Sequence, residues 1–377
     1  MRKRRTAAGV GLSIGAAFAL PAAAHADFQV DTTSNDGGVT FRPCTASPDD
    51  CSLPGALTDA AINVGPDNIT FAPTVTGSIT LGGSELPLIT GPTFIYGPGA
   101  DVLAIDGNHT SRIFDINETT AGDRVVINGL TIRNGTVTGG LDGGAIRNED
   151  ADLSIFDSVL SGNSANTAGG NGGALYDKGG SPSLGDDNLI INSTISGNTA
   201  ANKGGGLYGF ESLGGIYGTT VSGNTAGIGG GVEAYWTAFI EGSTIAGNTA
   251  TAIAGGGGLH SGGPTGSGPE ILNTIVAGNS APSSPDVSIN PSKSLTASFS
   301  LIQSTAGATI NSTGPNIFGV SPQLGPLQNN GGHVQTMKPA GLSPVVDKGL
   351  SAFTADARGL PRVFDVPAVA NAAGGNG

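Results

Sequence analysis

The chain has 377 residues, of which 65 are glycine and 22 are proline, while only 12% are charged. This composition excludes a coiled coil, and the net charge of −13 excludes a basic nucleic-acid-binding protein. With 37% hydrophobic residues the chain is too apolar for a disordered polyelectrolyte, so we expect a folded, turn-rich, all-β protein.

The N-terminus has the parts of an export signal. Basic residues at 2–5 precede an apolar stretch at 10–20, and Ala-His-Ala at 24–26 matches a signal peptidase site. We predict that residues 1–26 are a signal peptide and that the mature protein is extracellular, secreted or at the cell surface. The alternative is a short N-terminal membrane anchor, although the apolar run falls short of the roughly 20 residues that span a bilayer. Cleavage leaves 12 basic and 29 acidic residues, so nucleic acid is not an expected partner. No transmembrane span is expected in the mature chain.

Residues 27–68 are predicted to form an N-terminal segment that ends in a cap. Cys44 and Cys51 are the only cysteines, and in an exported chain a disulfide between them is favoured over two free thiols. Ser52 can N-cap a helix in the apolar run that follows, with Pro54 tolerated in its first turn. Such a helix would cover the strand edges at the start of the structure that follows.

One phrase recurs along the middle of the chain. Its copies are VVINGLTIRNG (125–135), LSIFDSVLSGNSA (153–165), LIINSTISGNTA (189–200), GIYGTTVSGNTA (215–226), FIEGSTIAGNTA (239–250) and EILNTIVAGNSA (270–281). Each copy holds short β-branched runs separated by Gly and Asn turns, too short for helices. One unit cannot bury its apolar side chains alone, but stacked units make parallel strands around a continuous core. We therefore predict a right-handed parallel β-helix over residues 69–310, with irregular final coils and a loop-rich C-terminal cap or tail over 311–377. Leucine-rich repeats would need regularly spaced leucines, which are absent.

Polar residues at fixed places in the repeat are expected to stack as well. The repeated asparagines are Asn163, Asn198, Asn224, Asn248 and Asn279. At one corner of successive coils their amides can hydrogen-bond one another and the turn backbone, which predicts a structural Asn ladder. A row of ligand-binding amides is the alternative. The intervening Gly clusters are interpreted as turns that need positive φ or close backbone approach.

Motifs at both ends resemble those of secreted β-helix families. Cys51-Ser52-Leu53-Pro54-Gly55-Ala56-Leu57 resembles the CSLREA motif, with Pro54 and Gly55 where that motif has Arg and Glu. Residues 322–349, followed by Asp356, Arg358, Gly359 and Arg362, are similar to the choice-of-anchor Q domain, and the GGAI phrases resemble the polymorphic outer membrane protein repeat. The resemblance implies a pectin-lyase-like β-helix exported to the cell exterior.

Strand alternation assigns one set of side chains to an outer face. If the aliphatic residue that closes each Gly cluster points inward, the first and third residues after it point outward. The outward set and its neighbours are the predicted ligand-binding residues: Tyr176, Lys178, Tyr208, Phe210, Glu233, Tyr235, Trp236 and His260. Aromatic rings stack on sugar C–H faces, and charged groups bind hydroxyls, so a polysaccharide or cell-surface glycan is the expected ligand. The alternative is aromatic stacking that only stabilises the sheet.

Catalysis and metal binding rest on smaller patterns. Glu211 and Glu233 on neighbouring units are candidates for a glycosidase carboxylate pair, unless both are simply solvated. The acidic cluster Asp142, Glu149, Asp150 and Asp152 is a candidate Ca²⁺ site, with a solvated loop as the alternative, and no other cofactor is expected. The predicted function is noncatalytic glycan or surface binding by a monomer. A polysaccharide lyase or glycoside hydrolase, and a structural or adhesive spacer, are the alternatives.

Overall fold

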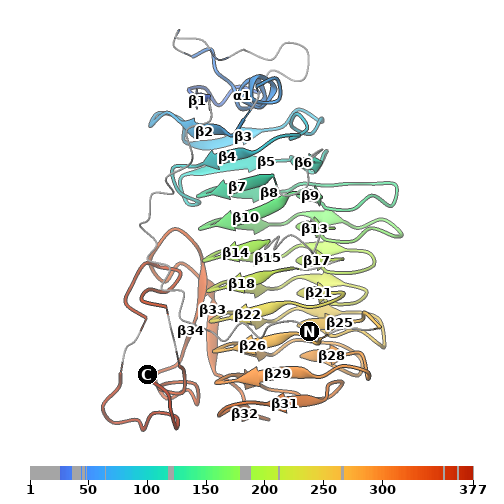
Figure 1. Cartoon of the computed structure of the whole chain (residues 1–377), viewed down its shortest axis with the longest axis vertical. Coiled ribbons are helices and arrows are strands. Elements are labelled where there is room, and N and C mark those ends of the chain that lie inside the picture. The colour runs from blue at the N-terminus through green and yellow to red at the C-terminus, as the bar shows by residue number, and fades with distance from the viewer. Residues whose placement is uncertain are drawn as a thin grey trace.

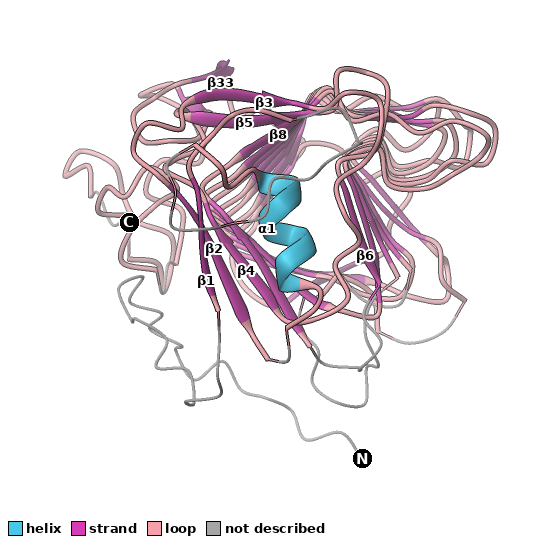
Figure 2. Ribbon diagram, turned by 90° about the horizontal axis from the view of Figure 1, so that it is seen from above, coloured by secondary structure: helices cyan, strands magenta, loops and turns pink. Residues whose placement is uncertain are grey.

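Parallel strands stacked along one axis make up most of the protein (Figure 1). The computed structural model describes residues 26–35, 44, 47, 49–63, 65–117, 123–178, 188–210, 213–264, 267–350, 353–362 and 365–376. Seen along the axis, the sheets enclose the interior (Figure 2). The predicted all-β parallel solenoid is confirmed.

Four parallel sheets, named here A to D, run along the stack. Sheet A comprises β1 (Asp27–Val30), β2 (Asp67–Phe71), β4 (Thr93–Tyr96), β7 (Arg124–Asn128), β10 (Asp152–Phe156), β14 (Leu189–Ile191), β18 (Gly215–Tyr217), β22 (Phe239–Glu241), β26 (Glu270–Leu272), β29 (Leu295–Ser298) and β31 (Ile310–Ser312). Sheet B comprises β3 (Gly77–Thr80), β5 (Leu103–Asp106), β8 (Thr131–Arg133), β11 (Val159–Ser161), β15 (Thr194–Ser196), β19 (Thr220–Ser222), β23 (Thr244–Ala246), β27 (Ile275–Ala277), β30 (Leu301–Ile302) and β32 (Ile317–Phe318). Sheet C comprises β6 (Phe114–Asn117), β9 (Ile146–Glu149), β13 (Leu175–Asp177), β17 (Leu207–Gly209), β21 (Val232–Ala234), β25 (Leu259–Ser261) and β28 (Val287–Ile289), and sheet D comprises β12 (Ser164–Ala165), β16 (Thr199–Ala200), β20 (Thr225–Ala226) and β24 (Thr249–Ala250). Strands of the stack thus lie before residue 69 and after residue 310.

The register places equivalent repeat residues directly over one another. In sheet B, Ile195 pairs with Val221 and Val221 with Ile245, and all three side chains are fully buried. Sheet A repeats the pattern with Ile190, Ile216 and Ile240. Because every second residue points inward, the repeat builds continuous aliphatic columns that no single coil could bury.

The repeated asparagines form a continuous hydrogen-bonded column at the corner after sheet B. In each step the backbone N–H and the side-chain Nδ2 of one asparagine donate to Oδ1 of the next, at 2.9–3.0 Å from Asn163 through Asn279. Nδ2 also donates to a backbone carbonyl, as Asn224 does to Ile195 O at 2.9 Å. The carboxylate of Asp286 closes the column by accepting N–H and Nδ2 of Asn279 at 3.1 and 2.9 Å. Burial raises the pKa of Asp286, although these hydrogen bonds and one from Ser304 N–H oppose the shift.

A second polar column lies at the corner before sheet B, and the sequence analysis missed it. Hydroxyls of Ser158, Ser193, Thr219, Ser243, Thr274 and Ser300 each accept a backbone N–H from the preceding coil at 3.1–3.4 Å. Its signal is a Ser or Thr two positions before each inward aliphatic residue. The two columns satisfy buried backbone groups on both sides of sheet B.

The Gly clusters allow coils to approach closely, as predicted. A Cβ at Gly205 would lie 2.3 Å from the carbonyl oxygen of Gly230 and 2.5 Å from that of Thr225. The preceding Gly204 adopts φ +64°, a left-handed conformation that favours glycine. The positive φ recurs at Gly143, Gly172 and Gly229, and the close backbone approach recurs at Gly144, Gly173, Gly230 and Gly257.

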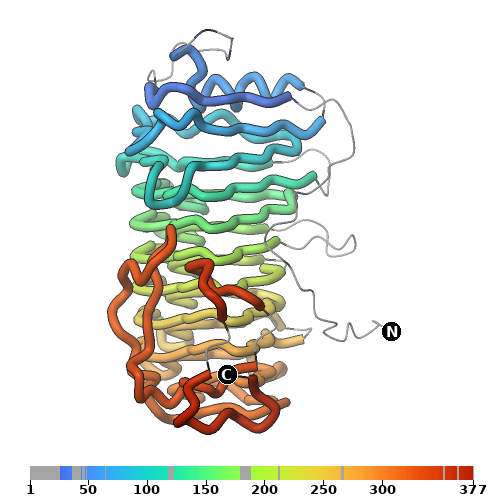
Figure 3. Tube along the Cα trace, turned by 90° about the vertical axis from the view of Figure 1, so that its left-hand side faces the viewer, coloured from blue at the N-terminus to red at the C-terminus, as the bar shows by residue number. Residues whose placement is uncertain are grey.

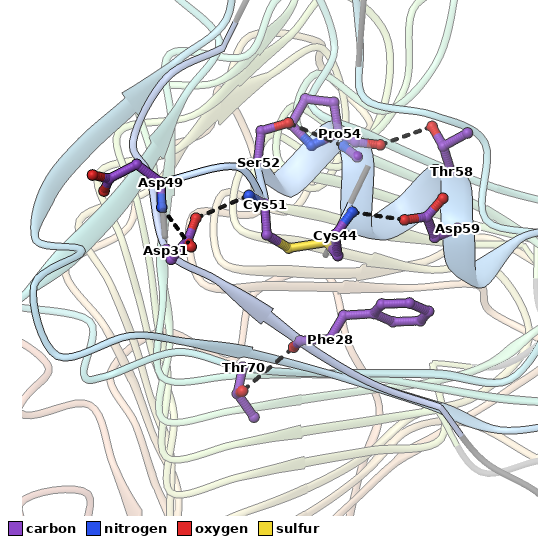
Figure 4. Close-up of a disulfide and its surroundings, with 11 residues drawn as sticks. Phe28, Asp31, Cys44, Asp49, Cys51, Ser52, Pro54, Thr58, Asp59 and Thr70 are labelled. Atoms are coloured by element: carbon purple, nitrogen blue, oxygen red, sulfur yellow. Dashed lines mark hydrogen bonds between the residues drawn. A yellow bond between two sulfur atoms is a disulfide. The ribbon is translucent and has the colours of Figure 1, made fainter. Parts of the chain in front are cut away.

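The helix α1 (Leu53–Ala60) covers the first end of the stack (Figure 2). Ser52 Oγ accepts the N–H of Gly55 at 3.2 Å, so the predicted N-cap is confirmed. The predicted Cys44–Cys51 disulfide is also present, and the Asp31 carboxylate accepts the Cys51 N–H at 2.9 Å (Figure 4). No helix in the described part of the chain has the length and hydrophobicity needed to span a membrane.

After its last coil the chain turns back along the outside of sheet B (Figure 3). We call residues 324–350, 353–362 and 365–376 the C-terminal arm; it begins with an antiparallel hairpin of β33 (Leu324–Gln328) and β34 (Thr336–Pro339). Thr194 in β15 donates its hydroxyl to Gln335 O at 2.6 Å. His333 Nδ1 lies 2.5 Å from Asp101, so the arm reaches coils near the start of the stack. The predicted C-terminal cap or tail therefore runs along the side of the solenoid.

Arg362 of the arm packs on the end of β22. A Cβ at Gly242 would lie 2.4 Å from its Nη2, so the guanidinium rests directly on that glycine. The neighbouring Glu241 is 8% exposed, and its buried Oε1 has no hydrogen-bond partner among the described residues. Burial raises the pKa of Glu241, and the charge of Arg362 offsets part of that shift.

Replacing Asn224 with alanine should destabilise the stack. The change removes the acceptor of two Asn198 donors and the donor to Ile195 O, and each buried group left unsatisfied costs about 1–3 kcal/mol. We expect the free energy of unfolding to fall by about 2–4 kcal/mol in urea denaturation. The exposed Asn202→Ala is the control, with an expected change below about 0.5 kcal/mol. Equal effects of the two changes would contradict a stabilising ladder.

The stability of Glu241→Gln relative to the parent should depend on pH. Because the folded pKa of Glu241 lies above its unfolded value, the stabilising contribution is complete at low pH and is lost as pH rises through the folded pKa. Glutamine does not titrate, so the free energy of unfolding of Glu241→Gln minus that of the parent should increase from about pH 4 to about pH 7. Denaturation across this range measures it, with the exposed Glu270→Gln as the control. A difference that decreases with pH would refute the assignment.

Candidate functional site

The outer face of sheet C carries the most varied chemistry of the repeat. Its register aligns Arg147, Tyr176, Tyr208, Glu233 and His260 in one column from β9 to β25. The residues two positions later, Lys178, Phe210 and Tyr235, follow the ends of β13, β17 and β21. Alternation thus brings the predicted ligand-binding residues to one face.

The aromatic rings of this face stack on one another. Tyr176 and Tyr208 lie 5.3 Å apart between ring centroids with an interplanar angle of 13°, and Phe210 and Tyr235 lie 5.3 Å apart at 14°. Trp236 contacts Tyr235 edge-on, at 5.4 Å and 88°. Stacking along the solenoid axis covers ring faces with neighbouring rings, and Tyr208 as a whole is only 6% exposed. Among these rings Phe210, 37% exposed, offers the most open surface.

We call Tyr176, Tyr208, Phe210, Tyr235 and Trp236 the aromatic cluster. Two lysines that the sequence analysis missed lie beside it. Lys203 Nζ lies 5.3 Å from the ring centroid of Tyr235, and Lys293 Nζ lies 5.7 Å from that of Trp236. Lys293 also donates to Trp236 O at 2.9 Å, and burial lowers its pKa while the Glu233 charge opposes the shift. Lys203 precedes a Gly cluster, and Lys293 follows β28. Neither lysine lies in a strand, so aligning the strand residues of the repeats does not reveal them.

Glu233 was expected to face the ligand, but its side chain is fully buried. Oε2 contacts Nδ1 of His260 on the next strand, and Oε1 has no hydrogen-bond partner among the described residues. The His260 side chain is 13% exposed. Glu233 therefore orients the imidazole from the preceding strand, and only His260 of the two reaches the protein surface. The other predicted catalytic residue, Glu211, lies outside the described residues.

The hydroxyl of Tyr208 remains a donor over a wide pH range. Burial raises its pKa, and the neighbouring Tyr176, Glu233 and Asp142 add to the shift. Burial and nearby acids also raise the pKa of Tyr176, despite the opposing charge of Arg147. Both phenols are thus held in the neutral, hydrogen-bonding form.

The predicted acidic cluster is divided among separate contacts. Asp142 Oδ1 accepts two hydrogen bonds from Asn171 at 2.8 Å, and Glu149 pairs with Arg147 at 2.6 Å. Asp150 is exposed with φ 73°, and Asp152 lies in β10. The described residues contain no group of three or more His, Cys, Asp or Glu side chains arranged to hold a metal ion.

A buried polar network lies on the inner side of β13. The fully buried Asp177 accepts Nδ2 of Asn148 at 2.8 Å and Nδ2 of Asn188 at 2.7 Å. Asn188 Oδ1 in turn accepts the N–H of Leu153 at 2.7 Å. The network ties sheets A and C together beneath Tyr176 and so supports the aromatic cluster from inside.

Taken together, the outer face of sheet C presents stacked rings with the partly exposed Tyr176, Lys203 and His260, whereas Tyr208 and Lys293 are each 6% exposed. Comparison of the chain with family models, curated proteins and solved structures finds no match. The face thus combines lysines beside Tyr235 and Trp236 with the acids Asp142 and Glu149 near Tyr176.

Removing the buried carboxylate should destabilise sheet C. Glu233→Ala leaves His260 and Lys293 without their nearest buried acid, and removal of one member of a buried pair costs about 3–5 kcal/mol. We expect a loss of about 3 kcal/mol in the free energy of unfolding at neutral pH, and a smaller loss for the isosteric Glu233→Gln. The exposed Glu270→Ala serves as the control in the same denaturation series. Similar stability of Glu233→Ala and Glu270→Ala would show that the carboxylate does not hold the cluster.

Proposed function

We propose that this protein binds an acidic polysaccharide, without cleaving it, along the outer face of sheet C. The observation that carries the proposal is the pairing of stacked aromatic rings with Lys203 and Lys293 on one face. The face extends over successive strands about 4.8 Å apart, which suits an extended chain rather than a compact ligand.

Ring orientation supports an acidic ligand over a neutral one. A neutral sugar is held on aromatic residues chiefly through its C–H face, which needs an open ring face. Here Tyr176, Tyr208 and Tyr235 stack with other rings, and the open surface of Phe210 is limited. The ammonium groups of Lys178 and Lys203 remain partly exposed, and ammonium groups bind carboxylates and hydroxyls.

Charge distribution supports the same ligand class. The whole chain has a net charge of −13, so most of its surface repels an anionic polymer. Lys178 and Lys203 are partly exposed at this face, and neither forms an ion pair with a described residue. Lys203 and Lys293 therefore place positive charge beside Tyr235 and Trp236 on an otherwise acidic molecule.

An extracellular location fits this ligand. The Cys44–Cys51 disulfide is typical of an oxidising compartment, and residues 1–26 have the pattern of an export signal. The same proposal includes membership of the CSLREA and choice-of-anchor Q families. It is based on the motifs at residues 51–57 and 322–362.

A polysaccharide lyase or hydrolase is the second candidate, and one observation favours it. The contact between buried Glu233 and His260 orients an imidazole toward the aromatic surface, as in an acid–base pair. A two-carboxylate hydrolysis would need a second acid beside Glu233 and His260, and Glu211, the predicted one, lies outside the described residues.

Binding can be followed through Trp236, the only tryptophan of the chain. Titration with polygalacturonate should change its fluorescence, and the neutral polymer dextran should not. The double variant Lys178→Gln/Lys203→Gln should weaken polygalacturonate binding by about tenfold, and added salt should weaken binding by the parent. Tyr96→Ala, at an exposed tyrosine of sheet A, should bind like the parent.

Other outcomes decide among the alternatives. Equal binding of dextran and polygalacturonate would overturn the preference for an acidic ligand. Release of unsaturated or reducing ends, abolished in His260→Ala, would establish the enzyme. Absence of both binding and turnover would leave a structural or adhesive spacer.

A further inference from the structure

A cavity of about 860 Å³ lies between the C-terminal arm and the outside of sheet B, on a different face from the aromatic cluster. Its volume falls in the range of small-molecule sites, roughly 300–1,000 Å³. One wall is the stack itself, at β19, β23 and β27, and the other is the arm from Thr336 to Ala373. The cavity therefore joins segments that are far apart in the sequence.

The stack wall offers hydroxyl groups in register. Thr194, Thr220 and Thr244 form one outward column of sheet B. The arm uses the first of them, because Thr194 donates its hydroxyl to Gln335 O at 2.6 Å. Thr220 and Thr244 line the cavity, and their hydroxyls form no hydrogen bond with a described residue. The arm thus contacts the column at one threonine and leaves the next two for another partner.

The arm wall is basic. It contributes Lys338, Lys348, Arg358 and Arg362, which are four of the chain's 16 basic residues. Its two acids are already engaged: Asp356 accepts Nε of Arg358 at 2.9 Å, and Asp347 accepts the N–H of Val366 at 3.1 Å. Lys348 Nζ donates to Ala370 O, a neutral partner.

Three of the four cations lack a hydrogen-bonded acid among the described residues, and of these Lys348 is already held by Ala370 O. Lys338 is exposed and forms no ion pair with a described residue. The guanidinium of Arg362 packs on Phe353, with 5.7 Å between its Cζ and the ring centroid, and donates no hydrogen bond to a described residue. Burial lowers the pKa of Arg362, against the opposing charges of Glu241 and Asp356, so a further anion in the cavity would stabilise its charged form.

We propose that this cavity binds a small carboxylate-bearing sugar, with Lys338 and Arg362 on the carboxylate and Thr220 and Thr244 on the hydroxyls. Cations and hydroxyls on opposite walls match a ligand that carries an acid at one side and hydroxyls at the other. The ligand can be a free sugar acid or the end of an acidic polysaccharide, since both present the same group.

Isothermal titration calorimetry with D-glucuronate tests the site, with D-glucose as the neutral probe. The parent should bind D-glucuronate at least tenfold more tightly than D-glucose or sulfate. Lys338→Gln should weaken binding by about threefold to tenfold, and Thr220→Val/Thr244→Val should reduce the preference for D-glucuronate over sulfate. Because Lys338 is exposed, its replacement should leave folding unchanged.

Arg124→Gln, at an exposed position of β7 in sheet A and outside both candidate sites, is the control and should bind D-glucuronate like the parent. No heat with D-glucuronate, equal affinity for sulfate, or an effect of Arg124→Gln equal to that of Lys338→Gln would each overturn the proposal. A uronate trisaccharide that binds more tightly than D-glucuronate, with the same loss in Lys338→Gln, would assign the site to chain ends. Equal affinity would assign it to free sugar acids.

Discussion

The structure depends on exact superposition of one coil on the next, and the buried Asn column makes that superposition obligatory. Each asparagine side chain satisfies the backbone and amide of its neighbour, from Asn163 to Asn279. A coil displaced by one residue would bury several unpaired polar groups, each at a cost of about 1–3 kcal/mol. Aliphatic columns alone tolerate sliding because hydrophobic contact has little directionality. The polar columns on both sides of sheet B therefore determine register, and the apolar interior supplies most of the stabilisation.

In-register stacking also decides what the outer faces can present. A residue type that recurs in the repeat becomes a row spaced by about 4.8 Å, and like charges at that spacing repel. The recurring polar residues are accordingly neutral: Asn, Ser and Thr. Tyrosines and Phe210 tolerate the spacing because their rings stack, as Tyr176 does on Tyr208. Ring stacking, however, covers ring faces, so the same constraint that builds the aromatic cluster favours ligand recognition through the partly exposed lysines beside the rings.

Much of the fold follows from local pattern, whereas the site depends on contacts that span many residues. The solenoid, the Ser52 cap and the disulfide were predictable because each rests on a repeat or a short motif. Alternation also placed Tyr176, Tyr208 and His260 in one column. The burial of Glu233 was not predictable, because it depends on His260 and Lys293 from later coils. Docking of the arm joins Thr194 to Gln335, 141 residues away, and no periodic signal encodes that pairing.

Departures from the repeat consequently mark the positions where chemistry can reside. A charge that occurs once in a column escapes repulsion, and it can meet an opposite or neutral neighbour on the next coil, as Glu233 meets His260 and Arg147 meets Asp115. Lys203 and Lys293 are single insertions of the same kind beside the aromatic rings. The arm provides the other route, because Lys338 and Arg362 lie outside the repeat and are free of its spacing. An acidic solenoid thus acquires positive surfaces only where a coil is irregular or where a non-repeating segment lies on it, and both candidate sites satisfy that condition.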